Sequence, residues 1–194
     1  IESDIPLARG LGSSASAIVA GIQLADSLCN LQLTTDEKVH LASCKEGHPD
    51  NAGASVTGGL VVGMHEVEQT ALMSFPLANV EVAVVIPKYE LLTSDSRNVL
   101  PSSLDFKESV KASAIANAFL AALLSGNYEL AGSLMKRDLF HQPYRRKLVP
   151  LLTEVEQLAY ENGAFGVALS GAGPSVICFA ETKNMSDLLQ CLSK

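Results

Sequence analysis

A run of glycines and serines near the start of the chain has the composition of an anion-binding loop. The loop consists of Pro6, Leu7, Ala8, Arg9, Gly10, Leu11, Gly12, Ser13, Ser14, Ala15 and Ser16. Gly10 and Gly12 allow the backbone to approach a ligand closely, and Ser13 or Ser14 can cap a helix that follows. The first backbone N–H groups of such a helix lack internal partners and lie at the positive end of its dipole. The pattern therefore predicts a phosphate site, although an ordinary loop before a capped helix explains this stretch alone about as well.

The loop differs from two common nucleotide-binding motifs. No Gly-Lys-[Ser/Thr] sequence follows Gly12, which excludes a Walker A loop. The third glycine of the dinucleotide fingerprint is missing, and no acidic residue ends a second strand about 20 residues later. Neither of these two protein classes is indicated.

Two further polar clusters interrupt the apolar patterning. Residues 46–51 read Glu-Gly-His-Pro-Asp-Asn, and residues 170–175 read Ser-Gly-Ala-Gly-Pro-Ser. Each cluster could be a turn on its own, since glycine, proline, asparagine and aspartate favour turns. Their occurrence on one chain together with the glycine-serine loop favours a functional interpretation.

The composition indicates a globular chain. Its 194 residues suffice for one large or two small domains, and 47% of them are hydrophobic whereas 18% are charged. The net charge of −7 and the dispersed arginines argue against nucleic acid and against anionic membrane surfaces as partners. The longest apolar runs are too short to span a bilayer, and no signal peptide is visible. Because the first residue is isoleucine, we expect the chain to begin within a longer protein.

The cysteines show neither a CxxC spacing nor a metal-ligand pattern with histidine. They are Cys29, Cys44, Cys178 and Cys191. Most of them lie in apolar or helical surroundings, so we expect buried free thiols. Free thiols are typical of a reducing cytosol, and we therefore expect a cytoplasmic protein.

The elements that position the first two clusters are expected to be helices followed by a strand. A central, buried, mostly apolar helix is predicted over residues 15–28. Thr34, followed by acidic residues, predicts the cap of a second helix, which runs to about Lys45 because Pro49 disfavours helix before it. A glycine-bounded strand is expected over residues 57–64.

The second half of the chain is expected to form a small α+β sandwich with an antiparallel sheet. The predicted strands cover residues 80–86, 167–170 and 176–180, and the predicted helices cover residues 111–124, 128–135, 148–161 and 186–192. The strand over residues 80–86 is rich in β-branched residues and is expected to be buried. Apolar patterning lapses near residues 73–79, so two domains are expected, over residues 1–75 and 76–194.

Taken together, the three clusters resemble the motifs of the GHMP kinases, the superfamily of galactokinase, homoserine kinase, mevalonate kinase and phosphomevalonate kinase. Pro-x-x-x-Gly-Leu-Gly-Ser-Ser-Ala is similar to the phosphate loop, and Leu-Ser-Gly-Ala-Gly-Pro-Ser at residues 169–175 is similar to the third motif. Within the superfamily, residues 46–51 and the segments around Arg97 and Arg145 are similar to the homoserine kinases. The resemblance covers nearly the whole chain.

The resemblance implies ATP-dependent phosphorylation of the side-chain hydroxyl of L-homoserine, a step of threonine biosynthesis, with ATP and Mg²⁺ required. It also implies an α+β fold, the GHMP kinase fold. Part of an S5-like, ATP-binding N-terminal domain would be followed by a ferredoxin-like C-terminal domain. A small-molecule substrate is implied, and a homodimer is left open.

For ATP and its metal ion, the resemblance points to the glycine-serine loop. The loop would wrap the triphosphate with backbone N–H groups, and the Ser14 hydroxyl would reach Mg²⁺. The magnesium-binding glutamate of the family lies eleven residues before Asn51, where this chain has His40. Glu37 and Glu46 lie close to that position in the sequence, and either could replace it.

For the substrate, the chemistry requires partners for a carboxylate and an ammonium group when both are desolvated. Arg97 and Arg145 are the expected carboxylate partners, because a guanidinium group binds a carboxylate bidentately. A surface ion pair is the alternative for each arginine. Thr93 and Gly171 are further expected substrate-binding residues, and the Gly171 loop would close over the phosphate or the substrate.

Asn51 occupies the position at which mevalonate-type enzymes place an aspartate base. An amide cannot accept the substrate proton, so we expect Asn51 to act by positioning and by transition-state stabilisation. His48 is expected to orient the substrate as a hydrogen-bond donor. These two residues, with Ser14, are the catalytic candidates.

Two other interpretations stay open at this point. One is another small-molecule kinase of the superfamily, of the mevalonate type, which Asn51 and the paired arginines oppose. The other is a catalytically inactive nucleotide-binding relative, which His40 supports. The first motif of the superfamily would lie before residue 1, so we expect this piece to be inactive alone.

Overall fold

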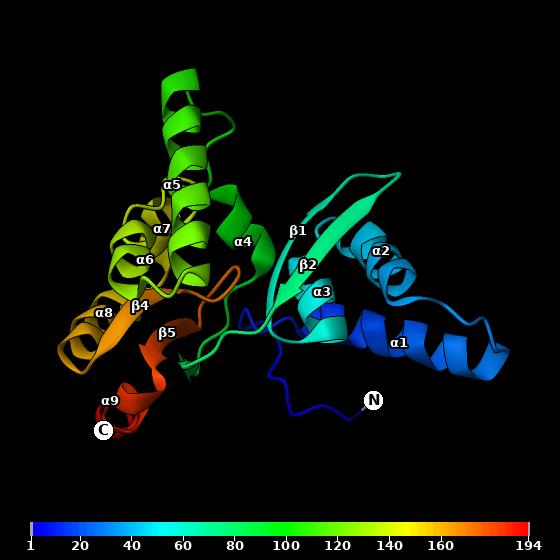
Figure 1. The fold of residues 1–194 in the computed structure, drawn as a ribbon, viewed down its shortest axis with the longest axis horizontal. Coiled ribbons are helices and arrows are strands. Elements are labelled where there is room, and N and C mark those ends of the chain that lie inside the picture. The colour runs from blue at the N-terminus through cyan, green and yellow to red at the C-terminus, as the bar shows by residue number, and fades with distance from the viewer. Residues whose placement is uncertain (1, 194) are drawn as a thin grey trace. The chain divides into compact units, whose positions relative to one another are not determined.

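The computed structural model describes residues 2–193, which form two compact units (Figure 1). The first unit comprises residues 2–5 and Gly12–Ala78, and the second unit comprises Pro6–Leu11 and residues 79–193. The glycine-serine loop is therefore divided, with its first half belonging to the second unit. No helix among residues 2–193 is both long and apolar enough to cross a membrane.

The first unit combines helices with a β-hairpin. Its elements are α1 (Ser13–Cys29), α2 (Thr35–Glu46), α3 (Asp50–Thr57), β1 (Leu60–His65) and β2 (Thr70–Phe75). The two strands are antiparallel, and His65 lies opposite Thr70. α2 begins as predicted after Thr34, whose hydroxyl accepts the Glu37 N–H while the Glu37 carboxylate accepts the Thr34 N–H.

The sequence patterns do not predict α3 or β2. α3 begins inside the cluster that was expected to be a turn, and it contains Gly53. A Cβ at Gly53 would lie 2.6 Å from the Leu72 side chain and 2.9 Å from the Val61 side chain. Close packing against the hairpin therefore stabilises a helix whose local propensity is poor. β2 lacks alternating apolar residues, and it forms by pairing with β1.

α1 agrees in extent with the predicted helix but is much less buried than expected. Ala15 is its buried residue, whereas Leu24 and Leu28 are 60% and 77% exposed. α1 packs along one side against α2 and α3. Ile18, Val19 and Ile22 are half-buried.

The second unit contains the predicted antiparallel sheet, with strand order β3-β5-β4. The strands are β3 (Val80–Val85), β4 (Ala164–Leu169) and β5 (Val176–Glu181). The helices are α4 (Thr93–Asn98), α5 (Phe106–Leu124), α6 (Tyr128–Met135), α7 (Gln142–Arg145), the 3-10 helix η1 (Arg146–Leu148), α8 (Leu151–Glu161) and α9 (Thr182–Leu192). α8 and α9 pack on the sheet, and the core between them includes Leu152, Val167, Val176 and Leu188.

β3 is an edge strand and is less buried than predicted. It pairs with β5 alone among the described strands, and Val82 and Val84 are 50% and 38% exposed. Ala83, on the opposite face, is buried in the core. The β-branched residues of this strand therefore indicate extended structure rather than burial on both faces.

The cysteines also depart from the expected burial. All four are free thiols, but Cys29 and Cys44 are exposed, Cys178 is buried and Cys191 is half-buried. Helical surroundings predict burial poorly here, because Cys29 ends α1 and Cys44 lies on an outward-facing side of α2. Only Cys178, on the central strand β5, has the predicted environment.

Candidate functional site

The first half of the glycine-serine loop is held within the second unit by hydrogen bonds to its backbone carbonyl groups. The Ser170 hydroxyl donates a hydrogen bond of 2.7 Å to the Gly10 carbonyl oxygen, and the Ser175 N–H donates one of 3.3 Å to the Arg9 carbonyl oxygen. Gly10 has a φ of 73°, and a Cβ there would overlap the Ser170 carbonyl oxygen. Only glycine fits, so the loop and the cluster at residues 170–175 are shaped to each other.

Arg9 belongs to the predicted ATP-binding loop, but its side chain is engaged in holding that loop. Its guanidinium group donates to the carbonyl oxygens of Pro87 and Lys88, at 3.1 and 2.9 Å, and lies 3.4 Å from the Glu90 carboxylate. We therefore assign Arg9 to anchoring the loop within the second unit.

The second half of the loop begins α1 in a way that differs from the prediction. Gly12, with φ 72° and ψ 23°, is the N-cap residue, and Ser13 and Ser14 lie in the first helical turn. The expected serine cap is therefore wrong: no side chain of residues 2–193 caps this helix. A left-handed glycine can occupy the cap because it has no Cβ to clash. The first-turn N–H groups stay available to an anion.

Glu37 and Glu46, the two candidate magnesium ligands, have different surroundings in the structure. The Ser14 hydroxyl donates a hydrogen bond of 2.6 Å to the Glu46 carboxylate. Glu37 instead closes the capping box of α2, and hydrogen bonds from Thr34 lower the pKa of its carboxyl group. Two oxygen atoms that could bind a metal ion, Ser14 Oγ and Glu46 Oε1, are thus adjacent. Mg²⁺ prefers such oxygen ligands.

Asn51 and His48 are held by the residue between them in the first turn of α3. The Asp50 carboxylate is 2.6 Å from His48 Nδ1 and accepts the Asn51 N–H at 2.6 Å. The Asn51 side chain lies beside Gly12: a Cβ built at Gly12 would be 3.3 Å from Asn51 Oδ1. The predicted residues of the first unit thus surround the start of α1.

In the second unit, Arg145 joins α4 to the third glycine cluster. Its guanidinium group donates to the Ser96 carbonyl oxygen at 3.2 Å and to the Gly171 carbonyl oxygen at 3.1 Å. Burial lowers the pKa of Arg145, and the positive charge of nearby Arg97 lowers it further. Thr93 lies one turn before Arg97 on α4. The positive charges of Arg97 and Arg145 favour an anion near them.

Two buried serines of this region were not among the predicted site residues. The Ser96 hydroxyl donates to the Ala172 carbonyl oxygen at 2.6 Å, and Ser175 is fully buried with no hydrogen-bond partner for its hydroxyl among residues 2–193. Ser175 carries the signal that could have identified it, since it ends a glycine-rich cluster between two strands. Ser96 carries none, because it lies in a uniformly polar stretch.

Comparison with known proteins decides the family. Residues 1–59 match the family described as GHMP kinases N terminal domain, and residues 119–193 match GHMP kinases C terminal. The chain belongs to the GHMP kinase superfamily. The expected α+β fold is confirmed.

Several similar proteins are homoserine kinases. The homoserine kinase of Bacillus licheniformis is 56% identical over 181 residues, covering 93% of this chain and 59% of that protein. The crystal structure of homoserine kinase from Cytophaga hutchinsonii is 27% identical with a TM-score of 0.86, covering 98% of this chain and 62% of that one. A solved Listeria monocytogenes structure is 42% identical with a TM-score of 0.85, covering 99% and 64%. The chain spans about three fifths of the length of these relatives.

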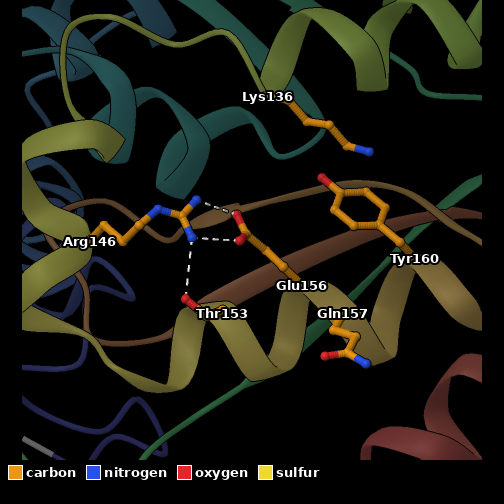
Figure 2. A pocket seen from close by; sticks show the side chains of 6 residues that line it. All are labelled: Lys136, Arg146, Thr153, Glu156, Gln157 and Tyr160. Atoms are coloured by element: carbon orange, nitrogen blue, oxygen red, sulfur yellow. Dashed lines mark hydrogen bonds and ion pairs between the residues drawn. The ribbon is translucent and has the colours of Figure 1, made fainter.

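The second unit of this GHMP kinase also has a hollow of about 390 Å³, lined in part by Arg146, which follows the predicted site residue Arg145 (Figure 2). Arg146 pairs bidentately with Glu156 at 2.6 and 2.7 Å, and the Lys136 ammonium lies 3.7 Å from the centre of the Tyr160 ring. Burial, followed by the negative charge of Glu156, raises the pKa of Tyr160 to about 12. Arg146 and Glu156 pair with each other, whereas the Tyr160 hydroxyl is buried and has no hydrogen-bond partner within residues 2–193.

Proposed function

We propose that the whole protein phosphorylates the side-chain hydroxyl of L-homoserine with ATP, forming O-phospho-L-homoserine and ADP. The observation that carries this proposal is the 56% identity, over 93% of this chain, to a protein named homoserine kinase. The proposal includes a place in threonine biosynthesis. It also includes a cytoplasmic location, which the four free thiols support because a reducing compartment maintains them.

For ATP, we assign the phosphates to the loop of residues 6–16. The supporting features are the left-handed Gly10 and Gly12 and the uncapped first turn of α1, which present backbone N–H groups to an anion. We assign Mg²⁺ to Ser14 and Glu46, whose two oxygens fit a cation that binds few protein groups and keeps phosphate and water ligands. When bound, Mg²⁺ neutralises charge on the β- and γ-phosphates.

For homoserine, we assign the substrate carboxylate to Arg97 and Arg145. Arg145 is held in place by two backbone carbonyl groups, and the nearby charge of Arg97 makes an added carboxylate favourable. Within residues 2–193 the exposed Arg97 has no carboxylate partner of its own. Thr93 and Gly171 are assigned to the same role because they adjoin this pair.

The chemical step needs little covalent help from the protein. The homoserine oxygen attacks the γ-phosphorus, the bond to the ADP oxygen breaks, and the hydroxyl proton passes to a phosphate oxygen or to water. Asn51 cannot take that proton, so we assign it and His48 to orientation. Asp50 supports this assignment, since it holds both residues through short hydrogen bonds.

The experiment is a coupled assay of ADP release by the protein expressed from its complete gene, with Mg-ATP and L-homoserine. Mevalonate and L-threonine serve as parallel substrates, and mass spectrometry identifies the product. Turnover with homoserine alone is expected. Turnover with mevalonate would overturn the substrate but not the superfamily, and ATP binding without any turnover would identify an inactive relative.

A further inference from the structure

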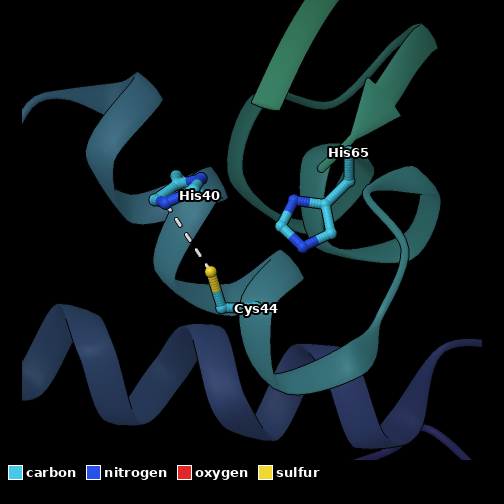
Figure 3. Close-up of side chains that lie close together, drawn as sticks. All are labelled: His40, Cys44 and His65. Carbon is cyan, nitrogen blue, oxygen red and sulfur yellow. Dashed lines mark hydrogen bonds between the residues drawn. The ribbon is translucent and has the colours of Figure 1, made fainter. Parts of the chain in front are cut away.

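Three side chains of the first unit lie close together and are of the types that bind transition metals. None of them belongs to the proposed ATP or substrate residues. His40 and Cys44 lie one turn apart on α2, and His65 ends β1. One ring nitrogen of each histidine and the Cys44 sulfur lie within 4.8 Å of one another. Figure 3 shows the His65 ring pointing from the hairpin toward the two residues of the helix.

The spacing along α2 explains why two of the three groups meet. Residues four apart in a helix lie on the same face, one above the other. Cys44 Sγ is 3.6 Å from His40 Nε2. Two ligands of a tetrahedral zinc ion, at about 2.3 Å for sulfur and about 2.05 Å for nitrogen, would lie about 3.6 Å apart. The helix therefore presents one edge of a tetrahedral site without rearrangement.

His65 supplies the third corner from the hairpin. The three ligand atoms lie within 4.8 Å of one another, so a shift of at most about 1 Å brings them to the edge length of a tetrahedral site. Cys44 is exposed and the two histidines are half-buried, so the side chains have room for this closure. Three protein ligands leave the fourth position of a tetrahedral zinc ion to a water molecule or another ligand.

Thr70 gives the two histidines the orientation that metal ligands need. Its hydroxyl oxygen lies 2.9 Å from His40 Nδ1 and 2.7 Å from His65 Nδ1. A hydroxyl oxygen has two acceptor lone pairs, so it can accept an N–H from both rings at once. Both Nε2 atoms are then unprotonated and free to bind a metal. Ligating histidines usually have such a partner on the second ring nitrogen.

We propose that His40, Cys44 and His65 bind one Zn²⁺ ion. The donor set of two imidazoles and one thiolate suits zinc and disfavours Mg²⁺, which prefers oxygen ligands. Binding converts the Cys44 thiol to a thiolate and releases its proton to solvent. The bound ion would link the β1–β2 hairpin, through His65, to α2. His40, which stands at the sequence position of the family's magnesium-binding glutamate, thus has a different role in this chain.

The experiment titrates the purified, chelator-treated full-length protein with Co²⁺ as a spectroscopic substitute for Zn²⁺. A thiolate-to-cobalt charge-transfer band that saturates at one equivalent is expected, together with loss of the band when Zn²⁺ is added. Cys44→Ser removes the charge-transfer band, and His65→Gln weakens cobalt binding by more than 10-fold. Thr70→Val retains the band but weakens binding by about 10- to 100-fold.

The matched control is Cys29→Ser, which removes the other exposed thiol of the first unit and leaves the titration unchanged. As a second readout, Zn²⁺ raises the melting temperature of the wild-type protein but not of Cys44→Ser. A titration of the folded wild-type protein without a saturable band overturns the proposal. So does a charge-transfer band that survives Cys44→Ser or disappears with Cys29→Ser.

Discussion

The Ser14 hydroxyl donates a hydrogen bond of 2.6 Å to the Glu46 carboxylate, although the two residues are 32 positions apart. The contact joins the first turn of α1 to the last residue of α2. It places a carboxylate at the part of the glycine-serine loop where phosphate is proposed to bind. This relationship is the reason for assigning Mg²⁺ to Glu46 and not to Glu37.

Replacing Glu46 tests that assignment. Glu46→Gln keeps an oxygen that accepts from Ser14 but removes the charge, so kcat/KM is expected to fall about 10- to 100-fold, as for a lost charged contact. The magnesium concentration for half-maximal rate should rise in the same assay. Glu37→Gln is the matched control, because glutamine also closes a capping box and activity should persist. An unchanged magnesium dependence in Glu46→Gln would contradict the assignment.

Gly10 is predicted to be irreplaceable on structural grounds alone. In Gly10→Ala the new Cβ meets the Ser170 carbonyl oxygen and lies 2.8 Å from the Gly173 carbonyl oxygen, at a φ of 73°. The free energy of unfolding is expected to fall by more than about 2 kcal/mol, measured by denaturant titration. Gly21→Ala, an exposed helical position with nothing within 4 Å of the Cβ, should instead stabilise by about 0.5–1 kcal/mol. Equal effects of the two substitutions would refute the packing argument.

Two adjacent arginines allow a controlled test of carboxylate binding. Arg145→Lys keeps the positive charge but loses the planar fork, so KM for homoserine should rise about 10-fold or more with a smaller change in kcat. Arg146→Lys changes the neighbouring residue, whose guanidinium group pairs with Glu156, and should leave KM unchanged. The steady-state rates of both variants are compared across homoserine concentrations. A larger effect of Arg146→Lys would move the substrate site to the other arginine.

Replacing Ser96 and Ser175 by alanine is expected to have different effects on the free energy of unfolding. Ser96→Ala removes a buried hydrogen bond to the Ala172 carbonyl oxygen and should lower the free energy of unfolding by about 1–2 kcal/mol. Ser175→Ala removes a buried hydroxyl that has no protein partner within residues 2–193, so it should be neutral or slightly stabilising. Thermal unfolding of the two variants distinguishes these results. Marked destabilisation by Ser175→Ala would reveal a partner that becomes available in the full protein.

Because the Cys178 thiol is buried, we expect the free energy of unfolding to fall at alkaline pH. Burial raises the pKa of Cys178 from 9.0 to about 11. Between these values the unfolded chain has lost the proton while the folded chain retains it, so the free energy of unfolding falls as pH rises. Denaturant titrations between pH 8.5 and about 9.5, below the range of most tyrosines, measure this slope. The slope should be smaller in Cys178→Ala, and an equal slope would exclude Cys178 as its cause.

Several elements follow from short-range patterns in the sequence. α6 spans Tyr128–Met135, the predicted residues, and the predicted Thr34 cap is present. β5 begins at the predicted Val176, whereas β4 begins at Ala164, three residues before the predicted start. Helix caps, apolar periodicity and turn residues act over a few positions, so they can be recognised in the sequence without knowledge of the fold. The motifs that identified the superfamily are likewise contiguous stretches of residues.

The remaining features depend on contacts between distant residues. α3 exists because Gly53 packs against the hairpin, and the exposure of Val82 follows from the place of β3 at the edge of its sheet. The choice of Glu46 beside Ser14 and the meeting of Cys44 with His65 are also long-range. The family, the motif residues and most helices could be predicted from the sequence, because those signals are local. Which carboxylate, guanidinium and thiol groups lie close together could not be predicted, because such contacts depend on how separate elements pack.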